Sequence, residues 1–170
     1  VNMAHFAEIR TDNDTVIRVV VINDNDISSL GENTTAAENW VASNIVNDPL
    51  LLESFDGIYP DTYWKRTSYN TRRGSHTGGG TAFRGNYAGT RYTYDSTNDE
   101  FLDPKEYDSW TYNYSTHEWD PPHACDLNAT YNSNGVMADW NEDAQEWHGH
   151  TVVANDLVKW STGSNSWVPR

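Results

Sequence analysis

The chain has 170 residues, which suits one domain or two small ones, and its 25 acidic and 11 basic side chains give a formal net charge of -14. Such an acidic balance disfavours a general nucleic-acid binder, because those proteins neutralise phosphates with lysine and arginine. A single cysteine, Cys125, excludes an intrachain disulfide framework and a cysteine-rich zinc site. No apolar run approaches the roughly 20 residues of a membrane helix, and residues 1–5 do not resemble a signal peptide.

Aromatic residues are the unusual part of the composition. Eight Trp, ten Tyr and four Phe make up 13% of the chain. Rings must therefore supply much of the core, since Leu, Ile and Met are scarce. Abundant Gly, Asn, Asp, Ser and Thr predict many turns, so we expect a mainly β fold.

The first predicted element is an antiparallel hairpin. Residues 5–10 alternate in polarity, a polar turn follows at 12–14, and residues 16–22 are a β-branched run. We expect the second strand to be buried on much of both faces. The polar run at 23–26 lacks the glycine and distal glutamate of a calcium-binding EF-hand loop, which favours a simple turn.

One helix is predicted over residues 35–46, where apolar side chains recur at helical spacing. Thr34 or Thr35 could cap it, with Glu38 at the reciprocal position of a capping box. We expect this helix to cover one face of the N-terminal strands, followed at 48–62 by a loop with an apolar patch.

A basic, glycine-rich loop is predicted at residues 65–91, flanked by strands at 63–69 and 89–94. It holds six basic and no acidic residues, whereas residues 1–64 carry a net charge of -9 and residues 92–170 a net charge of -11. The Gly78–Gly80 run lacks the spacing and the Gly-Lys-Ser/Thr ending of a phosphate-binding loop.

Two interpretations of this basic loop stay open. It docks on an acidic partner, such as a neighbouring copy, another protein or an anionic polymer, or it is a solvated flexible loop. On the first interpretation the contact residues are its arginines: Arg66, Arg72, Arg73, Arg84 and Arg91.

A repeated pair of aromatic residues marks the last half of the chain. The pairs, each seven positions apart, are Tyr94 with Phe101, Tyr112 with Trp119, Trp140 with Trp147, and Trp160 with Trp167. In a short-looped hairpin, residues i and i+7 face each other with their side chains on one face. A helical heptad has the same spacing, but the turn residues and prolines between the rings favour hairpins. We expect glycine to be used in the turn of the last hairpin, at Gly163.

These rings also raise a binding hypothesis. The side chains of Trp140, Trp147, Trp160 and Trp167 could form an exposed platform for a glycan or a partner. The alternative is that they are the core, which the scarcity of aliphatic residues favours.

Catalytic and metal-binding signatures are weak. There is no nucleophile elbow, no zincin helix and no Cys-His signature, and no carboxylate pair is singled out. The spacing of His148 and His150 relative to His117 and His123 meets no rule for metal sites. We therefore expect a protein that is not an enzyme and needs no metal or cofactor.

Seven short segments between residues 3 and 122 share their order and spacing with a known pattern. They are Met3–Ile9, Thr67–Asn70, Arg84–Gly89, Tyr92–Asp95, Asp103–Lys105, Tyr107–Trp110 and Glu118–Pro122. These segments resemble a family of small virion-associated proteins of marine cyanophages and related marine tailed phages. Residues 47–61 and 71–83 depart from that pattern and look longer or inserted.

The resemblance implies a structural protein located in the virion, as a capsid decoration, neck, tail or fibre component. Its partners would be other virion proteins and copies of itself, without nucleic acid or membrane. The alternative is a receptor- or glycan-binding module at a fibre or tail tip. We expect two regions: residues 1–91, with the helix and the basic loop, and residues 92–170, with the aromatic hairpins.

Overall fold

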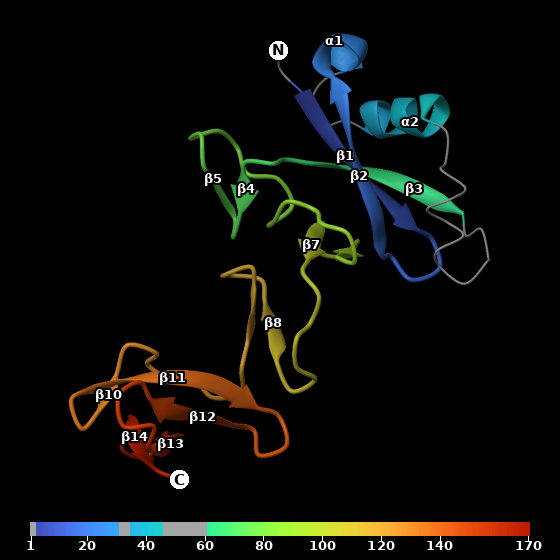
Figure 1. The fold of residues 1–170 in the computed structure, drawn as a ribbon. Coiled ribbons are helices and arrows are strands. Elements are labelled where there is room, and N and C mark those ends of the chain that lie inside the picture. The colour runs from blue at the N-terminus through green and yellow to red at the C-terminus, as the bar shows by residue number, and fades with distance from the viewer. Residues whose placement is uncertain (1–2, 31–34, 46–60) are drawn as a thin grey trace. The chain divides into compact units, whose positions relative to one another are not determined.

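The computed structural model describes residues 3–30, 35–45 and 61–170, and it confirms the predicted mainly β fold (Figure 1). The chain forms two compact units. The N-terminal unit holds residues 1–104 and 114–118, and the C-terminal unit holds residues 105–113 and 119–170. The predicted division after residue 91 is therefore displaced, because Tyr94 and Phe101 complete a core of the N-terminal unit.

A three-stranded antiparallel sheet organises the N-terminal unit, in the order β2-β1-β3. Its strands are β1 (Met3–Arg10), β2 (Val16–Asn23) and β3 (Thr62–Thr67). The predicted hairpin and third strand are confirmed, with Phe6 of β1 opposite Val20 and Arg66. The expectation that the second strand is buried on both faces is wrong at Val21, which is exposed. It is the central strand β1 that is covered on both sides, since β2 lies at an edge.

Helix α2 (Thr35–Asn44) covers one face of this sheet, where Phe6, Val41 and Trp64 belong to a single buried cluster (Figure 1). The predicted helix is thus confirmed over those ten residues. Glu38 does not close a capping box, because its carboxylate accepts from the backbone N–H of Arg66 at 3.0 Å. Thr34 and most of the predicted apolar loop at 48–62 lie outside the described residues.

The polar run after β2 forms one turn of helix rather than a simple turn. Helix α1 (Asp24–Ile27) is capped by Asn23, whose side chain accepts from the N–H of Asn25 at 3.0 Å, and a 3-10 turn, η1 (Ser28–Leu30), follows. None of the helices in the described ranges is long and apolar enough to cross a membrane.

The other face of the sheet is covered by the segment that follows β3. Ala7 and Ile9 of β1 pack there with Ala88, Tyr94 and Phe101. The basic segment is anchored by a small hairpin of β4 (Thr71–Arg72) and β5 (Ser75–His76), and by backbone hydrogen bonds along its length. The strand predicted at 89–94 is shorter than expected, because the N–H of Tyr92 closes a turn on the carbonyl of Gly89.

All four predicted aromatic pairs are confirmed. They lie in hairpins formed by β6 (Thr93–Asp95) with β7 (Glu100–Leu102), β8 (Thr111–Asn113) with β9 (Glu118–Asp120), β11 (Asn134–Asn141) with β12 (Glu146–Thr151), and β13 (Leu157–Ser161) with β14 (Ser166–Pro169). The ring centres of each pair are 5.2–5.5 Å apart, and the rings are tilted or edge-on rather than parallel. Edge-on contact places the positive rim of one ring against the negative face of the other.

The four hairpins share one turn design. Each turn has four residues, and the last of them adopts a left-handed backbone. These residues are Asp99, His117, Gln145 and Asn165, with φ between 49° and 58°. In three of the hairpins the residue after the first aromatic caps the turn: Asp95 accepts from the N–H of Asn98 at 3.3 Å, Asn141 from that of Ala144 at 2.8 Å, and Ser161 from that of Ser164 at 3.2 Å. Gly163 lies within the turn of the last hairpin, as expected, but it is not among the left-handed residues.

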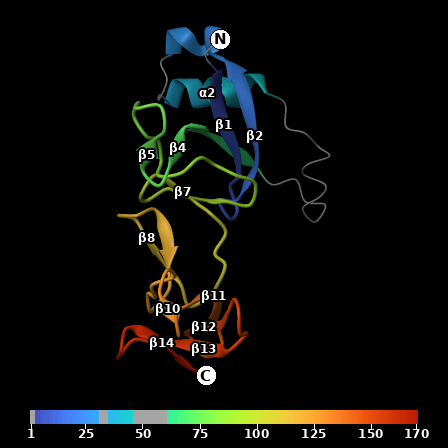
Figure 2. The same cartoon turned by 60° about the vertical axis from the view of Figure 1, so that its left-hand side comes forward.

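The C-terminal unit is a five-stranded meander in the order β10-β11-β12-β13-β14 (Figure 2). Its first strand, β10 (Thr130–Tyr131), was not predicted, and it is joined to β11 by a two-residue turn in which Asn132 and Ser133 both have positive φ. Val158, Trp160 and Trp167 form the centre of its core.

Candidate functional site: a polar pocket and the basic segment beside it

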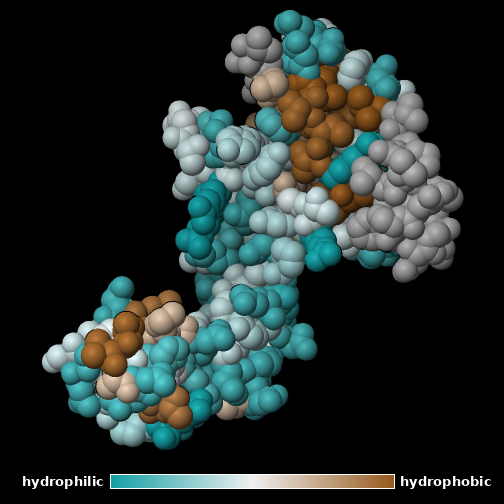
Figure 3. Space-filling view, in the orientation of Figure 1, coloured by the Kyte–Doolittle hydropathy of each residue, from teal (hydrophilic) through white to brown (hydrophobic). Residues whose placement is uncertain are grey.

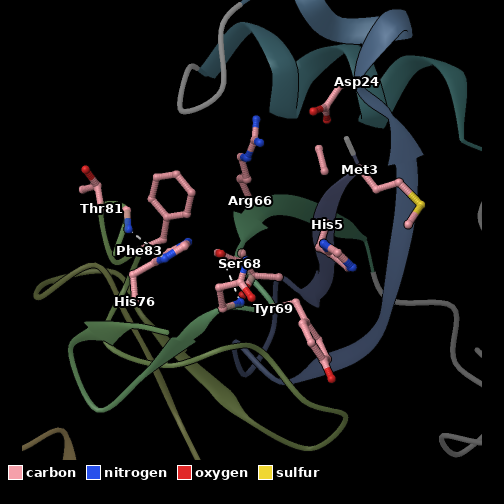
Figure 4. Close-up of a pocket in the computed structure, with 13 residues that line it drawn as sticks. Met3, His5, Asp24, Arg66, Ser68, Tyr69, His76, Thr81 and Phe83 are labelled. Carbon is pink, nitrogen blue, oxygen red and sulfur yellow. Dashed lines mark hydrogen bonds between the residues drawn. The ribbon is translucent and has the colours of Figure 1, made fainter. Parts of the chain in front are cut away.

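A pocket of about 530 Å³ lies at the end of β3 in the N-terminal unit (Figure 4). We call it the β3 pocket. Its polar lining includes Asp24 of α1, His5 of β1, Arg66 of β3, and His76 of β5, together with Ser68, Asn70 and Thr81. The exposed Tyr69 and Met3 stand at its border.

Arg66 belongs to the structure of this region rather than to its surface. The residue is only 6% exposed, and its guanidinium carbon lies 5.8 Å from the ring centre of Phe6 and 5.7 Å from that of Phe83. Cation–π contacts of this kind are stronger when the cation is removed from water. The prediction that Arg66 contacts an external partner is therefore wrong.

His5 and two tyrosines form an aromatic wall at the pocket. The His5 ring stacks on Tyr69 with 6.2 Å between centres, and it meets Tyr87 edge-on at 5.6 Å. Burial lowers the pKa of His5, the charge of Arg66 lowers it further, and the carboxylate of Asp24 acts in the opposite direction. The imidazole is consequently neutral at pH 7, since its ordinary pKa is already about 6.5.

His76 organises the opposite wall. Its Nδ1 accepts hydrogen bonds from the N–H of Gly78 at 3.1 Å and of Gly80 at 3.0 Å. The Gly78–Gly80 run, which lacks the pattern of a phosphate-binding loop, therefore packs around the imidazole of His76.

The pocket offers groups suited to a small polar ligand with one apolar face. Tyr69 is 72% exposed and presents a ring, while a buried oxygen of Asp24 accepts no hydrogen bond from the described residues. Hydroxyl and amide side chains complete the lining. The residues that the structure describes contain no group of three His, Cys, Asp or Glu side chains placed to hold a metal ion.

Arg84 covers the free edge of β3 and is the second residue for which the predicted partner contact is wrong. Its guanidinium pairs with Glu38 at 3.0 Å and with Asp99 at 2.6 Å, and it also donates to the carbonyl of Arg66. Glu38 accepts from the N–H of Arg66, so both backbone groups of one edge residue are satisfied by side chains. Such coverage protects a sheet edge from pairing with another strand.

The charges around Arg84 reinforce one another. Burial alone would lower the pKa of Arg84, but the neighbouring carboxylates of Asp99 and Glu38 raise it. Burial likewise opposes the shift of Asp99, yet hydrogen bonds from Tyr94 and Arg84 hold its pKa below the usual range. This arrangement therefore needs an ionised carboxylate to hold Arg84.

The remaining predicted arginines are on the surface. Arg72, Arg73 and Arg91 are exposed. Arg73 forms an ion pair with Glu118 in the β8–β9 hairpin, which leaves Arg72 and Arg91 without an ion pair among the described residues.

The hypothesis of an exposed tryptophan platform is wrong for three of its four residues. Trp140, Trp160 and Trp167 are only 4–5% exposed, so their rings are core. Trp147 is half-buried, and its indole N–H donates to the carbonyl of His123 at 2.8 Å. The structure thus agrees with the alternative interpretation, in which rings replace aliphatic side chains.

One arrangement of side chains near the basic segment was not predicted from the sequence. His117, at the tip of the β8–β9 hairpin, inserts beside Gly74 and Gly85, where its Nδ1 lies 3.0 Å from the carboxylate of Glu100. Its carbonyl accepts from the side chain of Asn86 at 3.1 Å. No spacing rule connects these residues, because they come from separate segments of the chain.

Comparisons with protein-family models, with curated proteins and with solved structures found no match to this chain. Its geometry and its sequence are therefore the basis for a functional proposal.

Proposed function

We propose that the chain is a structural component of a tailed-phage particle, which acts by protein–protein contact in a multi-copy assembly. The resemblance of its seven segments to marine phage virion proteins suggests the setting. The observation that carries the contact mechanism is the charge separation: exposed cations at Arg72 and Arg91 project from a chain whose net charge is -14.

Such a chain is electrostatically complementary to its own copies. A basic site on one copy attracts the acidic surface of a neighbour, and oppositely charged patches guide association. In a symmetric assembly each weak contact is repeated many times, so that avidity replaces individual affinity. Capsid decoration, neck, tail and fibre positions all provide such repetition.

The test is co-purification of the tagged chain with intact particles, with its copy number measured. Arg72→Glu and Arg91→Glu together should weaken attachment by up to roughly thirtyfold, at up to about 1 kcal/mol for each reversed surface charge. Raising the salt concentration should weaken attachment of the unmodified chain.

Lys105→Glu is the control for a single charge reversal outside the basic segment, to be compared with Arg72→Glu and Arg91→Glu one at a time, and it should leave attachment unchanged. Absence of the chain from purified particles would refute the structural role. Attachment that is insensitive to both salt and Arg72/Arg91 reversal would refute the electrostatic mechanism.

Saccharide recognition at the β3 pocket is a second candidate, which the exposed ring of Tyr69 favours. Aromatic faces stack on sugar rings, and the polar lining beside Tyr69 offers partners for hydroxyl groups. On a glycan array, Tyr69→Ala should remove binding and Tyr69→Phe should retain most of it. Equal signals for the two variants, or none for the unmodified chain, would exclude this candidate.

A further inference from the structure

The outer face of the C-terminal sheet has an ordered pattern of side chains. Strands β11, β12 and β13 are neighbours, with β12 in the middle. Their register places two rows of side chains across the three strands. The first row is Met137, His150 and Leu157, and the second row is Asp139, His148 and Lys159. Alternate residues of the same strands, such as Trp140 and Val158, face the core.

The first row has an exposed apolar residue at each end, with the half-buried His150 between them. Met137 is 60% exposed and Leu157 is 53% exposed, and Val152, which follows the last residue of β12, is exposed as well. Figure 3 shows hydrophobic residues at the surface of the C-terminal unit. Exposed apolar side chains gathered on one face of a sheet favour an interaction site.

The second row has a charge at each end, and its side chains are held by neighbours. Asp139 accepts a hydrogen bond from the hydroxyl of Tyr107 at 3.0 Å, and Lys159 pairs with Glu146 at 3.1 Å. Between them, His148 contacts Arg170 at 3.1 Å and Glu146 at 3.5 Å. Opposite charges therefore stand on either side of β12, each about 5 Å from it, which is the spacing of neighbouring strands.

We infer that this face binds the same face of a second copy, about a two-fold axis parallel to β12. Such an axis brings β11 of one copy over β13 of the other, because it exchanges the two sides of the middle strand. Met137 then meets Leu157 of the second copy, and Asp139 meets Lys159 of the second copy. Each contact occurs twice, as an isologous interface requires.

The symmetry of the pattern is the argument for a second copy. An interface with an unrelated protein places no condition on how the two sides of β12 correspond. Away from the axis, a two-fold interface favours an apolar residue opposite an apolar one and a charge opposite its counter-charge, and the outer members of both rows meet that condition. On the axis, His148 and His150 of β12 each face their own counterpart. Sheets commonly stack face to face about 10 Å apart with aligned strands.

This inference deepens the proposed assembly role by naming a partner and a surface. The two rows span three of the five strands of the sheet, and so small an area suits a weak and reversible contact. It is tested on the purified full-length chain, so that its failure would leave the particle co-purification test unaffected.

Sedimentation of the full-length chain over a range of concentrations tests the dimer. The unmodified chain should form a concentration-dependent dimer, and Leu157→Lys should lower its association constant at least tenfold, since a desolvated apolar anchor is replaced by a charge. Leu127→Lys is the matched control, because Leu127 is 57% exposed but lies outside the sheet. A chain that is monomeric at every concentration, or that responds equally to both variants, would overturn the inference.

A charge exchange tests the axis itself. Asp139→Lys and Lys159→Asp should each weaken the dimer, because like charges then face each other across the interface. The double variant should restore the dimer, since the two charges are exchanged on both copies. If each single variant weakens the dimer and the double variant fails to restore it, the two-fold arrangement is wrong.

Discussion

Two glycines of the basic segment leave the space that the side chain of His117 occupies. Gly74 and Gly85 have φ of +70° and +66°, a backbone region that residues with side chains rarely adopt. A Cβ atom on Gly85 would lie 2.8 Å from Nδ1 of His117. Part of the glycine content that suggested a mobile loop therefore serves a packed contact.

Gly85→Ala should lower the free energy of unfolding by roughly 2 kcal/mol or more, because left-handed backbone strain adds to the clash with His117. Urea unfolding measures the change. Gly79→Ala is the control: Gly79 has φ of +73° but no atom within 4 Å of an added Cβ, so only the strain of roughly 1 kcal/mol remains. Equal losses for the two variants would show that His117 imposes no steric demand.

His5 should make stability depend on pH in the acidic range. Its folded pKa is below the unfolded value of about 6.5, so the unfolded state takes up a proton first as the pH falls. The free energy of unfolding should fall from about pH 6.5 down to the folded pKa, and this contribution should be constant below that value. His5→Gln should flatten that part of the curve, and an unchanged curve would contradict the assignment.

At the scale of the elements, the left-handed end of each hairpin turn carries a side chain. Gln145 is exposed and has φ of 49°, so its backbone is strained without a packing reason. Gln145→Gly should therefore raise the melting temperature, because the free energy of unfolding increases by up to about 1 kcal/mol. Destabilisation by Gln145→Gly would contradict this account of the turn.

Gly163→Ala should also increase the free energy of unfolding, by roughly 0.4–1 kcal/mol, because Gly163 is not left-handed and an added Cβ meets no atom closer than 4.0 Å.

The sequence predicted the hairpins well because their defining contact is local. Rings seven positions apart and polar turn residues are both visible in a short window, as at Trp160 and Trp167. The β10 hairpin was missed because its turn, Asn132–Ser133, contains no glycine. Whether a ring such as Trp140 is core or platform depends on the neighbouring strands, which no local pattern specifies.

The arginine assignments failed for the opposite reason. A count of charges marks Arg66 and Arg84 as surface candidates, but each is engaged by a distant element: the rings of Phe6 and Phe83 for one, Glu38 of α2 for the other. The β3 pocket was equally beyond prediction, because its walls come from three separate parts of the chain.

At the scale of the whole molecule, each unit has its own buried clusters. Ile9 belongs to the N-terminal unit, and Trp167 to the centre of the C-terminal core. We expect two unfolding transitions. Trp167→Ala should lower or abolish one of them, at a cost of about 3–5 kcal/mol, and Ile9→Ala should lower the other. Calorimetry distinguishes this outcome from a single transition that moves with either variant.

The closeness of ring partners along the chain also has a consequence for the order of events during synthesis. Each C-terminal hairpin can close within about 1–10 μs once its few residues have left the ribosome. The pairing of β1 with β3 must wait until the intervening helix has been made, and contacts between sequence-distant segments form more slowly. A lone two-stranded hairpin is only marginally stable in water. We therefore expect hairpins to form one after another in the nascent chain, with protease resistance appearing only after neighbouring strands of the same sheet have been made.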